Sequence, residues 1–389
     1  MMIFMFWISL SILVGTYVGY PVLIYLLSKL SKVVRNREHK TEVNFLPEVT
    51  IIIAAYNEQR FIQEKIENTL ALNYPANKIN LFVVTDGSDD STPDIVKKFS
   101  TIKLFHLPER RGKIHAVNRV MPHVVTPIVI FSDANTLLNE MALKKIVRHF
   151  QDSHVGGVAG EKQIAKSSHE QSAGAGEGLY WRYESFIKKC DSDFNSIVGA
   201  AGELFSMRTE LFEPPPTNTI IEDFVVSMKV VSKGYRFVYE PEACAIETGS
   251  ATIDEEWKRK VRISAGGLQA VVKLFPLMNF FRFGAFSFQF IFHRVMRWTL
   301  APLSLLLVFI SSLELALNGI PFFQFLFVSQ LLFYVAALIG YLLKEKKLSV
   351  KIFVLPFYFV MMNLAVYAGA IRFLRGTQSV VWEKSKRAI

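Results

Sequence analysis

The sequence predicts an α/β domain with a mostly parallel sheet, joined to a membrane by transmembrane and interfacial α-helices. Of the 389 residues, 51% are hydrophobic and only 20% are charged, fewer charges than soluble domains usually carry. The apolar residues concentrate near the two ends of the chain. The middle has ordinary polarity, and strand-like segments alternate there with helix-like ones. Together these observations predict an α/β domain in the middle of the chain and membrane-associated helices near its two ends.

The first 28 residues contain no charged side chain. A helix needs about 20 apolar residues to cross the hydrocarbon of a bilayer, so this stretch is long enough. A basic cluster follows this stretch: Lys29, Lys32, Arg35, Arg37 and Lys40. A secretory signal peptide has the opposite order, with its basic residues before the apolar core. We expect residues 1–28 to form a transmembrane helix whose C-terminal end faces the cytoplasm.

The C-terminal region predicts about three more transmembrane helices within residues 299–375, followed by a basic tail at 376–389. The apolar stretches cover 299–317, 321–343 and 352–371. One N-terminal and three C-terminal transmembrane helices would place both ends of the chain outside the cell. The basic tail instead favours the cytoplasm, so the number of spans stays open. Residues 266–298 mix phenylalanines with basic residues, which is typical of helices lying in the membrane interface. A conventional amphipathic helix packed on the domain is the alternative.

Residues 41–265 carry the alternating pattern of the soluble domain. Continuous β-branched or apolar runs predict five strands, at 49–54, 79–85, 102–106, 127–131 and 155–158. Helical patterns lie between or after them, at 60–72, 93–98, 113–120 and 141–150. This alternation predicts parallel strands joined by helices.

Polar residues follow three of the predicted strands, where ligands of open α/β sheets bind. These segments are Ala55-Tyr56-Asn57-Glu58, Asp86-Gly87-Ser88 and Asp133-Ala134-Asn135. Such a carboxylate-lined edge suits a hard divalent cation, or recognition of hydroxyl and imide N–H groups. No P-loop motif and no G-x-G-x-x-G motif is present after the first strand, which disfavours a P-loop ATPase and a nicotinamide dehydrogenase. Cys190 and Cys244 have no metal-ligand spacing.

Seven motifs occur in order: Ala54-Ala55-Tyr56-Asn57-Glu58, Asp86-Gly87-Ser88, Gly112-Lys113, Asp133-Ala134-Asn135, Gly199-Ala200-Ala201-Gly202, Glu222-Asp223 and Arg259-Lys260-Val261-Arg262. With the flanking apolar stretches, they make the chain resemble a membrane-bound family 2 glycosyltransferase, similar to the cellulose, chitin, hyaluronan and poly-N-acetylglucosamine synthases. The resemblance implies a Rossmann-like GT-A fold for residues 41–265. It also implies a UDP-sugar donor and a catalytic domain on the cytoplasmic side of the plasma (inner) membrane.

The resemblance implies roles on the donor side. Tyr56 and Glu58 would line the nucleotide pocket, and Asp86 would accept a hydrogen bond from the uracil imide. Lys113 would approach the diphosphate as a point charge. Arg259 and Arg262 share a helix face and could grip the diphosphate as well. The alternative for Asp86 is an aspartate that caps a turn. The alternative for Lys113, Arg259 and Arg262 is that they are solvated basic side chains.

The resemblance also implies a metal site and a catalytic base. Asp133 and Asn135 would ligate Mg²⁺ or Mn²⁺, with Asn135 in place of the second carboxylate of the family's motif. Asp223 matches the base of an inverting transfer, and Glu222 is the neighbouring candidate; such general-base help is typically worth about 10²–10⁴ in rate. A helix N-cap pair is the alternative for these two carboxylates.

The acceptor side is implied by Gly202 and Glu203, which resemble the family's acceptor loop. In processive members a Trp follows the basic motif, whereas this chain has Ile263. We favour an inverting, metal-dependent synthase that extends an extracellular polysaccharide, with translocation through its own spans as one possibility. Single-sugar transfer to a lipid-linked acceptor is the alternative, and a non-catalytic transporter is the third. Expected partners are a UDP-sugar, a glycan or lipid-linked acceptor and membrane lipids, but no nucleic acid.

Overall fold

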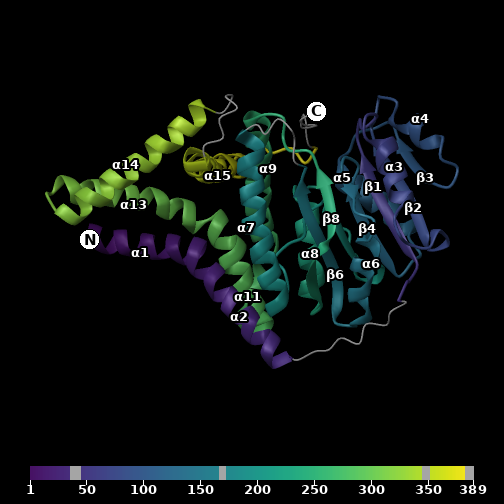
Figure 1. The fold of residues 1–389 in the computed structure, drawn as a ribbon, viewed down its shortest axis with the longest axis horizontal. Coiled ribbons are helices and arrows are strands. Elements are labelled where there is room, and N and C mark those ends of the chain that lie inside the picture. The colour runs from purple at the N-terminus through teal and green to yellow at the C-terminus, as the bar shows by residue number, and fades with distance from the viewer. Residues whose placement is uncertain (36–44, 166–171, 344–350, 382–389) are drawn as a thin grey trace.

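The computed structural model describes residues 1–35, 45–165, 172–343 and 351–381. A sheet with helices on its faces lies at one end of the molecule, and long apolar helices extend from the other end (Figure 1). Two long helices stand between these parts, α7 (Ser172–Phe194) and α9 (Ile253–Lys273). The predicted domain start at residue 41 and residues 382–389 of the predicted basic tail lie outside the described residues.

The first half of the sheet is parallel, as the sequence predicts. Strand β1 pairs in parallel with β2 on one side and β4 on the other, and β3 adds to β2. Their bounds are Val49–Ala55 (β1), Ile79–Asp86 (β2), Lys103–Leu107 (β3) and Ile128–Asp133 (β4). The helices of this half are α3 (Ile62–Leu70), α4 (Thr92–Lys97), α5 (Lys113–Val120) and α6 (Ala142–Val147).

The second half adds antiparallel pairings, so the sheet is mixed, although most of its strand pairings are parallel as predicted. The full strand order is β3-β2-β1-β4-β7-β6-β8-β5. The added strands are β5 (Leu137–Leu138), β6 (Val155–Ile164), β7 (Leu204–Arg208) and β8 (Arg236–Glu247). Strand β7 runs antiparallel to both β4 and β6, and β5 runs antiparallel to β8. The long helix α7 separates β6 from β7 in the chain, and β7 then inserts between β4 and β6.

Both faces of the sheet are covered, because side chains alternate along each strand. On β1, Ile51 and Ile53 point to the face covered by α3 and α6. Ile52 points to the opposite face, where α5 and α8 (Glu222–Ser232) pack. All three isoleucines are at most 1% exposed. The result is a three-layer domain with an apolar core on each side of the sheet.

Within the part of the chain that the structure describes, four apolar segments are long enough to cross a membrane: Met2–Val33, Leu300–Leu317, Pro321–Leu342 and Ile352–Leu374. The first combines α1 (Met2–Val14), a π-helical turn (Gly15–Gly19) and most of α2 (Tyr20–Arg35), so it continues past residue 28. The others are α13 (Leu300–Leu317), α14 (Pro321–Leu342) and most of α15 (Lys351–Leu374). They correspond to the apolar stretches of the sequence.

Helix α9 connects the sheet domain to the apolar helices. It packs along α15, where Gly369 lets the two backbones approach closely; a Cβ at position 369 would lie 2.7 Å from Ser264 Cβ. Three short helices precede α13, namely α10 (Phe280–Phe283), α11 (Ala285–Phe290) and α12 (Met296–Trp298). Phe275, Phe280 and Phe281 are exposed there, within the region predicted to lie in the membrane interface.

Candidate functional site

The carboxyl ends of β1, β2 and β4 lie side by side at one edge of the sheet. Ala54 of β1 is level with Asp133 of β4, and Ala55 is level with Thr85 of β2. The polar segments that follow these strands therefore leave the sheet at the same edge. This register brings the predicted residues Tyr56, Asp86 and Asp133 to one region, as the parallel arrangement requires.

Asp86 holds the loop that leads into α5. Its carboxylate accepts backbone N–H bonds from Arg111, at 3.1 Å to each oxygen, and from Gly112 at 2.5 Å. Gly112 has φ +98°, a conformation that favours glycine, and Lys113 begins α5 directly after it. Asp86 is 6% exposed. It thus fixes the position of Lys113, in addition to the base-recognition role that the resemblance implies.

The ring of Tyr56 faces the guanidinium of Arg110, which lies in the loop between β3 and α5. The guanidinium carbon of Arg110 lies 3.6 Å from the ring centroid, which is close contact for a cation–π pair. Glu58 follows in the next turn, where its backbone N–H donates to Thr92 Oγ1 at 2.8 Å. The β1 and β2 loops are thereby tied to each other at the predicted nucleotide pocket.

Lys113 lies among the carboxylates of the site. Its Nζ donates to Asp133 Oδ1 at 2.6 Å and lies 3.5 Å from Glu222 Oε1. Burial lowers the pKa of Lys113, but the charges of Asp133 and Glu222 outweigh burial and hold the pKa above its ordinary value. The ammonium therefore remains charged and places positive charge beside Asp133 and the start of α8.

Gly202 leaves a space on which three charged groups converge. A Cβ at this position would lie 3.1 Å from Lys113 Nζ, 3.4 Å from Asp223 Oδ2 and 3.8 Å from Asp133 Oδ2. These residues come from α5, α8 and the end of β4, so the tertiary fold brings them together. The absent side chain keeps open a small polar region between one cation and two carboxylates.

Asp223 has the protonation behaviour of a group that works near neutral pH. Burial and the neighbouring charge of Glu222 raise its pKa to about 7, against the opposing effect of Lys113. The helix N-terminus at Glu222 places both carboxylates in the first turn of α8. A carboxylate with such a pKa can both take up and release a proton under physiological conditions.

Glu203 belongs to a buried network that the sequence did not predict. It pairs with Lys162 of β6, which also pairs with Glu247 of β8 and lies 3.9 Å from Glu177 of α7. Burial alone would raise the pKa of Glu203, but Lys162 lowers it to about 2. Glu203 is therefore ionised at neutral pH. Lys162 lies between Glu161 and Gln163 in β6, so its local sequence gave no signal of burial.

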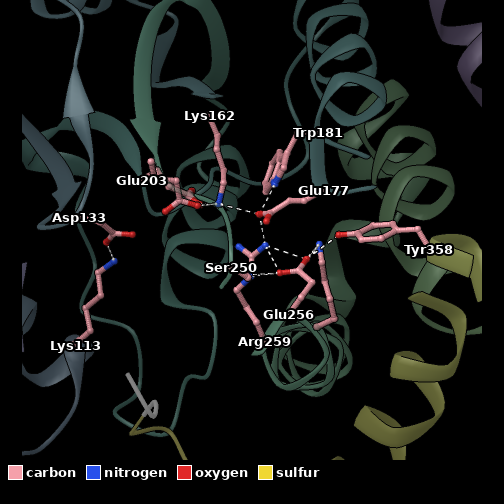
Figure 2. Close-up of polar contacts among 12 residues, drawn as sticks. Lys113, Asp133, Lys162, Glu177, Trp181, Glu203, Ser250, Glu256, Arg259 and Tyr358 are labelled. Atoms are coloured by element: carbon pink, nitrogen blue, oxygen red, sulfur yellow. Dashed lines mark hydrogen bonds and ion pairs between the residues drawn. The ribbon is translucent and has the colours of Figure 1, made fainter. Parts of the chain in front are cut away.

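The structure places Arg259 in the same network rather than in contact with Lys113. Its guanidinium pairs with Glu177 and with Glu256, at 2.8 Å for the latter. Figure 2 shows this group apart from the Lys113–Asp133 pair, with the Lys162–Glu203 pair above and between them. Arg262 lies close to the N-terminus of α8, where its guanidinium donates to the Ile220 carbonyl at 2.9 Å.

A divalent cation fits the chemistry of the Asp133 turn. The Oδ2 atom of Asp133 faces the space at Gly202, while Oδ1 is engaged by Lys113. Asn135 follows in the same turn, which Thr136 closes by donating from Oγ1 to the Asp133 carbonyl at 2.9 Å. Across the described ranges, no group of three or more His, Cys, Asp or Glu residues is arranged to hold a metal. Asp133 and Asn135 would hold such a cation, and water or diphosphate oxygens would supply its remaining ligands.

The C-terminal end of the described chain returns to this edge of the domain. A Cβ at Gly112 would lie 3.8 Å from a methyl group of Val381 and 3.9 Å from one of Val380. The segment after α15 thus contacts the loop that Asp86 holds. Figure 2 shows this segment below Lys113.

Comparison with known proteins finds similarity to glycosyltransferases. The glycosyl transferase family 2 model matches residues 50–213. Poly-β-1,6-N-acetyl-D-glucosamine synthase of Staphylococcus aureus (strain COL) is 29% identical over 268 residues, covering 66% of this chain and 63% of that protein. The Staphylococcus epidermidis enzyme of the same name is 28% identical over 248 residues, covering 61% of this chain and 58% of its own length. The chain thus spans less than two thirds of these relatives.

A solved structure shares the fold over nearly the whole chain. The mannosyltransferase PcManGT from Pyrobaculum calidifontis superposes with a TM-score of 0.69 at 21% identity, covering 95% of this chain and 99% of that one. This likeness extends beyond the sheet domain to the apolar helices. It confirms the Rossmann-like GT-A architecture predicted from the motifs. Residues 50–213 thus match the glycosyl transferase family 2 model, and the chain shares the fold of PcManGT.

Proposed function

We propose that the protein is an inverting, metal-dependent glycosyltransferase that uses a UDP-sugar to extend a polysaccharide at the membrane. The observation that carries the proposal is the convergence of Lys113, Asp133 and Asp223 on the space at Gly202. One point there is within reach of a cation for the leaving diphosphate and a carboxylate for the acceptor hydroxyl. Sugar transfer with inversion needs both groups beside the anomeric carbon.

Asp223 acts as the catalytic base in this proposal. It takes the proton of the acceptor hydroxyl as that oxygen attacks the anomeric carbon and the bond to the diphosphate breaks. The raised pKa, about 7, makes Asp223 a stronger base than an ordinary aspartate while leaving much of it ionised at neutral pH. Glu222, 3.5 Å from Lys113, balances the charge of that ammonium and keeps the pKa of Asp223 raised.

Lys113 stabilises the leaving diphosphate, and Asp133 with Asn135 would hold a divalent cation there. The cation supplies charge neutralisation for the developing diphosphate negative charge. PcManGT was solved in complex with GDP-Man and Mn²⁺, which supports a nucleotide-sugar donor and a metal for this fold. The staphylococcal relatives are named for a polymer of N-acetylglucosamine, which supports UDP-N-acetylglucosamine as the first donor to test.

The membrane setting supports an exported polymer. Among the described residues, four apolar segments are long enough to cross a bilayer, and the basic residues Lys29 and Lys32 lie near the C-terminal end of the first of them, Met2–Val33. By the positive-inside rule these basic residues support a cytoplasmic sheet domain, where nucleotide sugars are available. Passage of the product through the apolar helices is part of the proposal.

Single transfer to a lipid-linked acceptor is the second candidate, and Ile263 favours it. The resemblance places an aromatic residue at this position in processive enzymes, and Ile263 offers no aromatic surface to an acceptor sugar. The two candidates predict products of different size from the same donor.

The test uses the purified full chain in nanodiscs with a panel of UDP-sugars, each with Mg²⁺ and with Mn²⁺. Released UDP reports donor use, and gel filtration of labelled product reports its length. A product of high molecular mass supports the synthase, and a single-sugar lipid supports the second candidate. The absence of UDP release with every donor and both cations would contradict the proposal.

A further inference from the structure

Lys65 is a fully buried lysine that no role described above uses. It lies on α3 between Ile62 and Ile66, and all three side chains are 0% exposed. Lysine is almost never fully buried unless it is paired, because removing an ammonium from water is costly. In the described part of the chain, no carboxylate lies within ion-pair distance of its Nζ. Its contacts are instead two hydroxyl groups.

Those hydroxyls flank the Asp133-Ala134-Asn135 turn. Lys65 Nζ donates to Ser132 Oγ at 2.7 Å and to Thr136 Oγ1 at 3.4 Å. Ser132 Oγ in turn donates to the Glu203 carbonyl at 3.1 Å. Thr136 Oγ1 donates to the Asp133 carbonyl at 2.9 Å. One buried nitrogen is thus linked through single hydroxyls to the backbone at both Asp133 and Glu203.

The direction of these hydrogen bonds follows from the ammonium group. When Lys65 is protonated its ammonium only donates, so both hydroxyls accept from it and their own O–H groups are free to donate outward. The outward bonds end on the Asp133 turn and on the Glu203 turn. A methionine at position 65 would fill the same space but would leave both hydroxyl rotors without this constraint.

Helix α3 also holds the far end of the same segment. Asn68, three residues after Lys65, donates from Nδ2 to the Leu138 carbonyl at 2.9 Å and accepts from the Leu138 N–H at 2.8 Å. The segment from Ser132 to Leu138 is therefore clamped at both ends by one helix. This arrangement fixes the Asp133 turn relative to the sheet, and Lys65 adds the link to Glu203.

We propose that Lys65 is a positioning residue for sugar transfer: it fixes the donor-side turn at Asp133 relative to the acceptor-side turn at Glu203. The inference rests on the proposed function of this site. Reacting groups must be held close to their productive geometry, and a misplacement of about 1 Å costs about 10²-fold in rate. Loss of Lys65 should therefore act on kcat more than on donor binding.

The test compares Lys65→Met with a matched control, Lys78→Met, in the full chain in nanodiscs. Lys78 donates to the Leu46 carbonyl at 2.7 Å, near the start of β1 and at the opposite end of the strand from the site. We expect Lys65→Met to lower kcat for UDP-sugar turnover about 10- to 100-fold, with the donor KM changed less than about threefold. Lys78→Met should keep the wild-type kcat.

Ser132→Ala and Thr136→Val remove one hydroxyl each, and they test the inference even if Lys65→Met does not fold. Each should lower kcat, and Lys65→Met/Ser132→Ala should be no slower than the slower single variant, because both act through one network. A Lys65→Met kcat within twofold of wild type, an equal loss in Lys78→Met, or unchanged kcat in both hydroxyl variants would overturn the inference. Wild-type protein without turnover would instead refute the proposed function on which the inference rests.

Discussion

Lys113 donates to Asp133 at 2.6 Å, and this pair joins the start of α5 to the end of β4 across the candidate site. The two residues are 20 positions apart in the chain. Asp86 holds the loop before Lys113 through backbone hydrogen bonds, so the position of the ammonium is set by the β2 end as well. The pair leaves Asp133 Oδ2 facing the space at Gly202.

Lys113→Met should weaken donor binding. The variant removes the only cation of the three groups that converge at Gly202, so the diphosphate would face the carboxylates without compensation. We expect the donor KM to rise about 10- to 100-fold, as for the loss of a charged contact worth about 1.5–3 kcal/mol. Titration with UDP-sugar measures this, and Lys97→Met, which removes an exposed lysine, is the control. An unchanged KM would contradict the assignment of Lys113.

The rate of transfer should rise with pH through about 7 and level off above it. The pKa of Asp223 is raised to about 7 by burial and by Glu222, and only its ionised form can accept a proton. Below pH 7 the rate should fall about tenfold per pH unit, because the ionised fraction falls in that proportion.

Lys113 lowers the pKa of Asp223, so the pH profile gives a second check. In Lys113→Met the rise should move to higher pH, measured as kcat against pH at saturating donor. A profile that is flat from pH 5 to 8 in the wild type would show that Asp223 is not the base.

Arg259→Gln should destabilise the protein more than it weakens donor binding. Arg259 pairs with Glu177 and Glu256, which are at most 1% exposed, and removing one partner of a buried ion pair costs about 3–5 kcal/mol. A lower thermal unfolding midpoint in detergent measures this loss. Lys258→Gln is the control on the same helix, because its pair with Glu255 is exposed and such pairs contribute about 0–1 kcal/mol. A raised donor KM at wild-type stability would instead support a diphosphate contact.

Tyr358→Phe should loosen the contact between α15 and α9. The Tyr358 hydroxyl donates to Glu256 Oε1 at 2.7 Å, and a hydrogen bond to a charged group contributes about 1.5–3 kcal/mol. Tyr367→Phe, on the same helix, removes a bond to the neutral Pro302 carbonyl and should cost less. The thermal unfolding midpoint in detergent measures the loss in each variant. Equal unfolding midpoints for Tyr358→Phe and Tyr367→Phe would contradict a larger contribution from the Glu256 contact.

Much of the first half of the fold could be predicted from sequence. Strand β1 and helix α5 lie where their patterns predict them, because buried β-branched runs and the Gly112 helix start are local signals. The mixed order of the second half could not be predicted. Strand β7 has five residues and inserts between β4 and β6, a pairing that depends on the path of α7 rather than on its own residues.

The site was predicted unevenly for a similar reason. Residues at strand ends, such as Asp86 and Asp133, are placed by the sheet itself, and the structure brings them together. The partners of Arg259 come from α7 and α9, so their contact depends on how two long helices pack. Lys65 carried a visible signal, since a lysine between Ile62 and Ile66 lies on the apolar stripe of its helix.

The most direct test of the central claim compares wild type and Asp223→Asn with labelled UDP-N-acetylglucosamine and Mn²⁺. Donor binding and sugar transfer are measured on the same nanodisc preparations. The site predicts that the wild type forms a product, whereas Asp223→Asn binds the donor within about threefold of wild type and transfers at least about 10²-fold more slowly. Transfer by Asp223→Asn at the wild-type rate would contradict the assignment of Asp223 as the base.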